Sequence, residues 1–165
     1  FDLKNASEDA VREYLRDMGI VGMGGAVFPS HVKLSVPRGK QLEELIINGA
    51  ECEPFITCDD RLMREQAAEV VQGSALFGKL IGAKRVLIGV EDNKPEAIEA
   101  LKAAQVALDA PVEVITVPTI YPTGGAKELI RVLTGKEVPG SKRSTDFAVQ
   151  VFNAVSYTHL RAHET

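Results

Sequence analysis

The chain has 165 residues, a length that suits one domain with a buried core. Its 45% hydrophobic and 25% charged residues are typical of a soluble globular protein, and its net charge of −4 argues against a nucleic-acid binder. No apolar run approaches the roughly 18 residues of a membrane span, and the polar first residues do not resemble a signal peptide.

The first predicted element is a helix that begins at an Asn5 N-cap, with Glu8 completing a capping box, and ends at Gly19. Its apolar residues recur at helical spacing, as Val11, Tyr14, Leu15 and Met18. A glycine-rich run over residues 22–34 follows this helix, and residues 45–48 predict a short buried strand.

The rest of the chain predicts alternating helices and strands, namely a long helix from Asp59 or Asp60 to residue 81, a strand over 85–90, a helix with Pro95 in its first turn, a strand over 112–117, and a helix with Leu129, Ile130 and Leu133 that Gly135 ends. Strand–loop–helix units in a row imply an α/β fold whose largely parallel sheet is covered by helices on both faces. Ligands bind such sheets beyond the carboxyl ends of the strands, which here are residues 48–54, 91–94 and 118–125.

Residues 22–34 read Gly-Met-Gly-Gly-Ala-Val-Phe-Pro-Ser-His-Val-Lys-Leu. Gly22, Gly24 and Gly25 allow a ligand to approach the backbone closely, and successive N–H groups in such a turn can hold a phosphate. Lys33 supplies a cation nearby in the sequence. The run follows a helix and lacks the third glycine of G-x-G-x-x-G, so it is not the dinucleotide fingerprint. It predicts either a cradle for a phosphorylated cofactor or a tight turn.

Two loops at predicted strand ends carry polar groups that suit a cofactor. Asn48 can donate and accept toward a heterocycle edge, while Glu51 and Glu53 can accept from sugar hydroxyls or a nicotinamide amide. The alternative for these glutamates is a solvated acidic loop. Residues 121–126, Tyr-Pro-Thr-Gly-Gly-Ala, lead into a helix N-terminus, which favours anions.

Cys52 and Cys58 are too few for a disulfide framework, match no common zinc pattern and cannot alone hold a conventional iron–sulfur cluster. They indicate a reducing, cytosolic setting. His159 and His163 have the i, i+4 spacing of a metal pair, but residues 155–165 have the appearance of a truncation or a foreign extension. We therefore assign no metal ligand and no catalytic residue.

Several ordered segments together resemble the RnfC family, whose members belong to the Rnf electron-transport complex and are related to the flavin- and NADH-binding subunit of respiratory complex I. These segments are residues 22–34, 48–57 with 59–63, 91–97, and 121–125 with 133–139. The resemblance covers roughly residues 10–154. We therefore expect residues 1–154 to form an FMN- and NADH-binding domain like that of the complex I flavin subunit, as a fragment of a longer subunit.

The resemblance implies a non-covalent FMN at the ligand edge of the sheet, with NADH as the substrate that transfers a hydride to it. The residues that it assigns to cofactor binding are Gly22, Gly24, Gly25, Ala26, Phe28 and Lys33 around the flavin and its phosphate, Asn48 and Glu51 on the flavin or ribityl groups, Glu53 at an acidic position, and Tyr121, Gly124 and Gly125 closing the site. Ala50, Gly125 and Ala126 stand where complex I relatives carry acidic residues, so this chain offers fewer acidic contacts.

The resemblance also implies partners: other subunits of a membrane electron-transport complex and a ferredoxin-like electron carrier. The 4Fe-4S clusters of the family would lie in a part of the protein outside this chain, and the domain would sit on the cytoplasmic face of the cell membrane through its partner subunits. Two alternatives stay open. One is a soluble NADH-dependent flavin reductase, for example for a corrinoid, and the other is a binding or scaffold domain without flavin.

Overall fold

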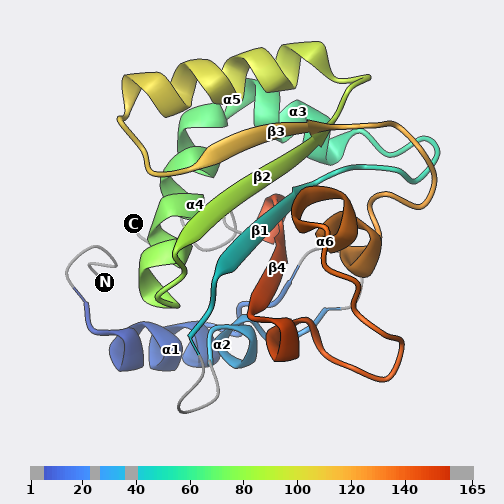
Figure 1. The fold of residues 1–165 in the computed structure, drawn as a ribbon. Helices are drawn as coiled ribbons and strands as arrows, with labels where there is room; N and C mark the ends of the chain where they lie inside the picture. The colour runs from blue at the N-terminus through green and yellow to red at the C-terminus, as the bar shows by residue number, and fades with distance from the viewer. Residues whose placement is uncertain (1–5, 23–26, 36–40, 157–165) are drawn as a thin grey trace.

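The computed structural model describes residues 6–22, 27–35 and 41–156, and within them the chain forms a parallel sheet with helices on both faces (Figure 1). The elements in chain order are α1 (Glu8–Asp17), α2 (Ser30–Lys33), β1 (Glu44–Gly49), α3 (Cys58–Glu65), α4 (Ala67–Leu80), β2 (Arg85–Glu91), α5 (Pro95–Ala107), β3 (Glu113–Val117), α6 (Ala126–Thr134), a 3-10 helix η1 (Ser144–Phe147) and β4 (Val149–Asn153). The predicted α/β fold with a parallel sheet is confirmed.

The four strands lie in the order β3-β2-β1-β4, and all three pairings are parallel. On the central strand β1, Leu45 lies opposite Val86 of β2 on one side and Gln150 of β4 on the other. The chain moves from β1 outward to β2 and β3, then returns to β4 across β1. A topological switch point therefore lies between β1 and β4, where open α/β sheets bind their ligands.

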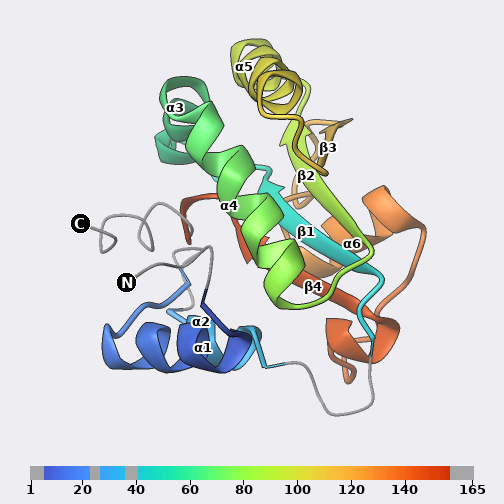
Figure 2. The same ribbon diagram turned by 90° about the vertical axis from the view of Figure 1, so that its left-hand side faces the viewer.

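Both faces of the sheet are buried, because successive side chains of a strand point to opposite faces. Leu45 and Ile47 of β1 belong to the core cluster that includes residues of α4 and α5, whereas Ile46 belongs to the cluster on the α6 face. Figure 2 shows this layering, with α3, α4 and α5 on one side of the sheet and α6 on the other. Burial on both faces explains why residues 45–47 and 86–88 are continuous apolar runs.

The start of α1 differs from the prediction. The helix begins at Glu8, and the side chain of Ser7 is its N-cap, accepting from the backbone N of Ala10 at 3.3 Å. The predicted cap, Asn5, lies outside the described residues. The other end is as predicted, since Gly19 has a φ of 66° just beyond the helix.

The predicted single helix over residues 59–81 is wrong, because the chain leaves helical geometry at Gln66, where φ is −129° and ψ is 37°. The break separates α3, which packs on α5, from α4, which packs on both α5 and the sheet. The N-cap position of α3 is Thr57, so Asp59 and Asp60 lie in the first turn.

Strand β4 is an element that the sequence pattern did not predict. It pairs with β1 and places Phe152 in the core cluster of the α4 face and Val151 in that of the α6 face. Its buried Gln150 donates from Nε2 to the backbone O of Lys33 at 2.6 Å, which fastens α2 to the edge of the sheet.

Candidate functional site

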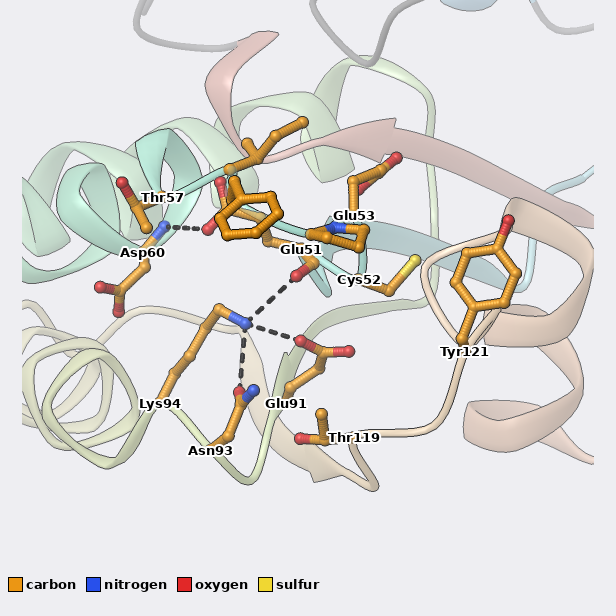
Figure 3. Close-up of a pocket in the computed structure, with 13 residues that line it drawn as sticks. Glu51, Cys52, Glu53, Thr57, Asp60, Glu91, Asn93, Lys94, Thr119 and Tyr121 are labelled. Atoms are coloured by element: carbon orange, nitrogen blue, oxygen red, sulfur yellow. Dashed lines mark hydrogen bonds and ion pairs between the residues drawn. The ribbon is translucent and has the colours of Figure 1, made fainter.

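The carboxyl ends of β1, β2 and β3 surround a pocket of about 470 Å³ (Figure 3). All three segments that the sequence placed at the ligand edge contribute to its walls, together with residues 55–57 and 60, which lie beyond the first of them. The walls are formed by Glu51, Cys52, Glu53, Pro54, Phe55, Ile56, Thr57, Asp60, Glu91, Asn93, Lys94, Thr119 and Tyr121. Segments far apart in the sequence therefore meet as predicted. Glu53 and Tyr121 are exposed and line the pocket, so their side chains are accessible to a ligand.

Asn48 joins the end of β1 to the loop before α6. Its Nδ2 donates to the backbone O of Gly124 at 2.8 Å, and its Oδ1 accepts from the backbone N of Ala50 at 3.0 Å. Gly124 is required by this approach, because a Cβ there would lie 2.5 Å from the O of Ala50 and 2.7 Å from Cys52 Sγ. The next residue, Gly125, occupies the N-cap position of α6. The contact between Asn48 and Gly124 thus fixes the distance between the loop after β1 and the loop before α6.

Glu51 is buried, and its carboxylate binds the N-terminus of α3. Oε1 accepts from the backbone N of Asp59 at 2.9 Å, and Oε2 accepts from the backbone N of Asp60 at 3.3 Å. These are two of the N–H groups that a helix leaves without an internal partner, and a negative charge is favourable at that end. The family resemblance assigns Glu51 to the flavin, whereas in this structure both of its oxygens hold the helix.

Asp59 lies buried between Glu51 and the end of β4, where Asn153 Nδ2 donates to its Oδ2 at 2.8 Å. Burial raises the pKa of the Asp59 carboxyl, with a further contribution from the charge of Glu51, while the hydrogen bond from Asn153 opposes the shift. Ligand atoms of Glu51, Cys58 and Asp59 lie within 4.8 Å of one another. Their carboxylates already accept from helix N–H groups and Asn153, so we assign no metal to this cluster.

The raised pKa predicts how stability responds to pH. A folded-state pKa above the ordinary value of about 3.9 means that this group contributes stability at low pH and loses it as pH rises. Asn at this position does not ionise, so Asp59→Asn does not lose stability in this way as pH rises. The unfolding free energy of the variant minus that of the wild type should therefore be larger at pH 7 than at pH 4. Urea titrations at both pH values measure the difference.

Asp92 supplies a control of opposite sign. Its carboxylate accepts from the backbone N of Thr119 at 3.1 Å and from Thr119 Oγ1 at 2.5 Å, which lowers the pKa of Asp92. This group therefore stabilises the fold above the unfolded pKa and loses that effect as pH falls. Asp92→Asn should become less stable relative to the wild type as pH rises through the acid range toward the unfolded pKa of about 3.9, so the urea titrations of this variant extend below pH 4. The same trend in both variants would contradict the assignment.

The glycine-rich run is described at its two ends. Gly22 N donates to the O of Phe28 at 2.8 Å, and Val21 and Pro29 form an antiparallel bridge, so the two described ends of the run lie side by side. Phe28 is 44% exposed. Three of the predicted flavin contacts, Gly24, Gly25 and Ala26, lie outside the described residues.

Lys33 extends from α2 toward β4. Its Nζ donates to the O of Val151 at 3.3 Å and lies 5.1 Å from the ring centroid of Phe152, and desolvation lowers the pKa of this half-buried ammonium. A Cβ built on Gly22 would lie 3.8 Å from Nζ. Lys33 is therefore beside the glycine-rich run as predicted, and Val151 O is the one hydrogen-bond acceptor that it has among the described residues.

Three polar residues of the site were not assigned a role from sequence. Asn153 ends β4, and Glu91 and Lys94 form an ion pair with Nζ and Oε2 2.6 Å apart at the end of β2. A sequence signal existed for Glu91, because it directly follows the apolar run of β2 at the ligand edge. For Asn153 the local signal was absent, because Gln150 interrupts the apolar residues of 149–152.

Comparison with known proteins assigns the chain and its fold to a class. A family model described as the Nuo51 FMN-binding domain matches residues 15–162, so the chain belongs to this family of flavin-binding domains. Two solved structures of an NAD+-reducing NiFe-hydrogenase superpose with TM-scores of 0.79 and 0.82. Each covers 94% of this chain and 30% of the hydrogenase chain at 24% identity, a likeness that shows the fold alone.

Curated relatives narrow the family to RnfC proteins of ion-translocating oxidoreductase complexes, the type expected from sequence. The chain is 45% identical to the RnfC protein of Rhodobacter capsulatus over 150 residues, covering 91% of this chain and 29% of the relative. It is 49% identical to that of Pectobacterium atrosepticum over 162 residues, covering 98% and 23%. The corresponding protein of the Na+-translocating ferredoxin:NAD+ oxidoreductase complex of Acetobacterium woodii is 46% identical over 151 residues, with 92% and 34% covered. The chain thus spans about a third or less of these relatives.

Proposed function

We propose that residues 1–154 form a domain that holds FMN for hydride transfer from NADH, within an ion-translocating NADH:ferredoxin oxidoreductase. Membership of an FMN-binding domain family and similarity to RnfC proteins support this proposal. Bound FMN would join a two-electron donor to one-electron acceptors, which we expect to be 4Fe-4S centres outside this chain.

Lys33 is the observation that carries the proposal. It is a half-buried cation beside Gly22 and strand β4, and its one acceptor among the described residues is the carbonyl of Val151. The hydroxyl of Ser30, on the same helix α2, is buried, and its Oγ has no hydrogen-bond partner in the described part of the chain. An ammonium and a hydroxyl with unused donors fit the phosphate of FMN, which offers charged oxygens to both.

The remaining residues would shape the ring end of the site. We expect the Asn48–Gly124 hydrogen bond to hold the two loops together and so to shape this end of the site. Glu53 and Tyr121, which are exposed at the pocket, would meet the nicotinamide ring of NADH. The flavin contacts of Gly24, Gly25, Ala26, Phe28 and Gly125 stay predictions of the family resemblance.

The proposal is tested by adding FMN to the purified 165-residue chain. We expect flavin fluorescence to be quenched on binding, and NADH then to bleach the flavin absorption band under anaerobic conditions faster than in a protein-free mixture of FMN and NADH. The absence of binding at tens of micromolar FMN would contradict the proposal and favour a scaffold domain. FMN binding without accelerated bleaching would support the flavin site but contradict hydride transfer from NADH.

We further propose that the domain acts on the cytoplasmic face of the cell membrane through partner subunits and passes electrons toward a ferredoxin-like carrier. The names of the relatives, which are subunits of ion-translocating complexes, support this placement. Within the ranges that the structure describes, no helix is both long enough and apolar enough to cross a bilayer. Co-purification of a tagged full-length protein with membrane subunits would test it.

A further inference from the structure

Glu91 has a buried carboxylate oxygen with no hydrogen-bond partner among the described residues. The residue ends β2, is 1% exposed and lines the pocket. Its Oε2 pairs with Lys94 Nζ at 2.6 Å, whereas Oε1 has no partner among residues 6–22, 27–35 and 41–156. Figure 3 shows that this second oxygen points away from Lys94, toward the side of the pocket where Cys52 and Tyr121 lie.

Lys94 holds the Glu91 carboxylate in place but cannot satisfy its free oxygen. Besides Glu91 Oε2, Nζ donates to Asn93 Oδ1 at 3.1 Å and to the O of Glu51 at 3.4 Å, so all three ammonium donors are engaged. The backbone of the turn brings the two side chains together, because Lys94 N donates to Glu91 O at 3.1 Å. The ion pair therefore fixes the carboxylate of a residue that lines the pocket and leaves its buried Oε1 without a partner among the described residues.

A buried acceptor without a donor is unfavourable, and native structures contain few of them. An ionised carboxylate can only accept, so the missing partner is an N–H or O–H donor. The position in the sheet indicates which end of a cofactor supplies it. Neighbouring strands lie about 4.8 Å apart, so β2 is roughly 10 Å across the sheet from β4, where Lys33 lies. A cofactor with its phosphate at Lys33 would turn its ring, rather than its hydroxyl-bearing chain, toward Glu91.

We propose that Glu91 Oε1 accepts a hydrogen bond from an amide-type N–H on the ring end of a bound cofactor. This inference rests on the proposed function, which supplies two sources of that group: the imide N–H of the flavin ring and the carboxamide of nicotinamide. Phe55 and Ile56, exposed at the rim of the same pocket, provide apolar surface for such a ring. Glu91 thereby selects ligands by a donor at one edge of the ring.

Ligand analogues test the inference on the unmodified chain. FMN is compared with 3-methyl-FMN, which lacks the imide N–H, by fluorescence quenching. In the FMN-loaded chain, NAD+ is compared with its 3-acetylpyridine analogue, which lacks the carboxamide N–H, by calorimetry. One of the two analogues should bind about 10- to 100-fold more weakly than its parent, the range of a hydrogen bond to a charged group, and its identity names the source.

Glu91→Gln separates the hydrogen bond from steric effects of the analogues. The variant should bind the parent ligand about 10- to 100-fold more weakly and lose the discrimination against the analogue. Glu113→Gln is the matched control, since Glu113 is an exposed carboxylate paired with Arg85 at 3.0 Å at the opposite end of the sheet, and it should behave as the wild type.

Three results would overturn the inference. If the wild type binds each analogue as tightly as its parent, neither ligand donates to Oε1, and a water molecule is its partner instead. This comparison uses only the wild type, so it does not depend on how well Glu91→Gln folds. If Glu91→Gln still binds the analogue as much more weakly than its parent as the wild type does, the difference has a steric cause and not the hydrogen bond to Glu91. A wild-type chain that binds no FMN would overturn the proposed function as well, whereas FMN binding without discrimination would overturn only the role of Glu91.

Discussion

Replacing Lys33 with Met is expected to weaken FMN binding about 10- to 100-fold, the range of one hydrogen bond to a charged group. The Met side chain retains most of the apolar stem but removes the ammonium that lies beside Gly22. Desolvation already lowers the pKa of Lys33, so the charge is unfavourable in the folded apo chain, and its removal should cost little stability. The dissociation constant of FMN is measured by fluorescence quenching.

Riboflavin, which lacks the phosphate, is the ligand control for this variant. If Lys33 meets the phosphate, Lys33→Met should leave riboflavin affinity unchanged and bring FMN affinity close to it. Lys102→Met, at an exposed position on α5, is the protein control and should bind both ligands as the wild type does. An equal loss for riboflavin and FMN would mean that Lys33 acts only as an anchor between α2 and the Val151 carbonyl.

Gly124→Ala is expected to lower the unfolding free energy by about 1–3 kcal/mol, the usual cost of forcing an extra carbon into a packed site. The added Cβ would lie 2.5 Å from a backbone oxygen, the O of Ala50, and a backbone atom moves less easily than a side-chain tip. For a chain of this size the midpoint of thermal unfolding should fall by roughly 2–4 °C for each kcal/mol. Calorimetry or circular dichroism measures it.

The same substitution should also weaken FMN binding, because displacement of the loop breaks the hydrogen bond from Asn48 Nδ2 to Gly124 O. Gly140→Ala is the matched control. A Cβ at Gly140 would meet no atom within 4 Å, and the position requires no left-handed backbone, so stability and affinity should stay close to wild type. If Gly124→Ala were equally neutral, the close approach of the two loops would not be needed.

The central strands of the sheet could be predicted because their signal is local. Residues 45–47 and 86–88 are apolar on both faces, and glycines mark the ends of α1 and α6. Strand β4 lacks such a signal, since Gln150 interrupts its apolar residues. That glutamine is buried because its amide donates to the O of Lys33, a contact across 117 residues that no local pattern contains.

The candidate site, too, could be predicted only in part. Parallel topology alone brings the ends of β1, β2 and β3 to one edge, so the meeting of Asn48 with Gly124 followed from the predicted fold. The hydrogen-bond partner of each polar atom did not follow from the predicted fold. Glu51 accepts from the first turn of α3 because the loop after β1 lies against that helix end, and the free oxygen of Glu91 depends on the engaged donors of Lys94. Such pairings are tertiary, and no short stretch of sequence encodes them.

The pairing of the last strand with the first has a consequence for biosynthesis. Lys33 leaves the ribosome early, but its acceptor Val151 follows 118 residues later, and β1 lacks its β4 neighbour until then. Contacts of such long sequence separation form late in folding. Flavin loading should therefore follow release of β4 from the exit tunnel, and nascent chains arrested before Val149 should capture no FMN.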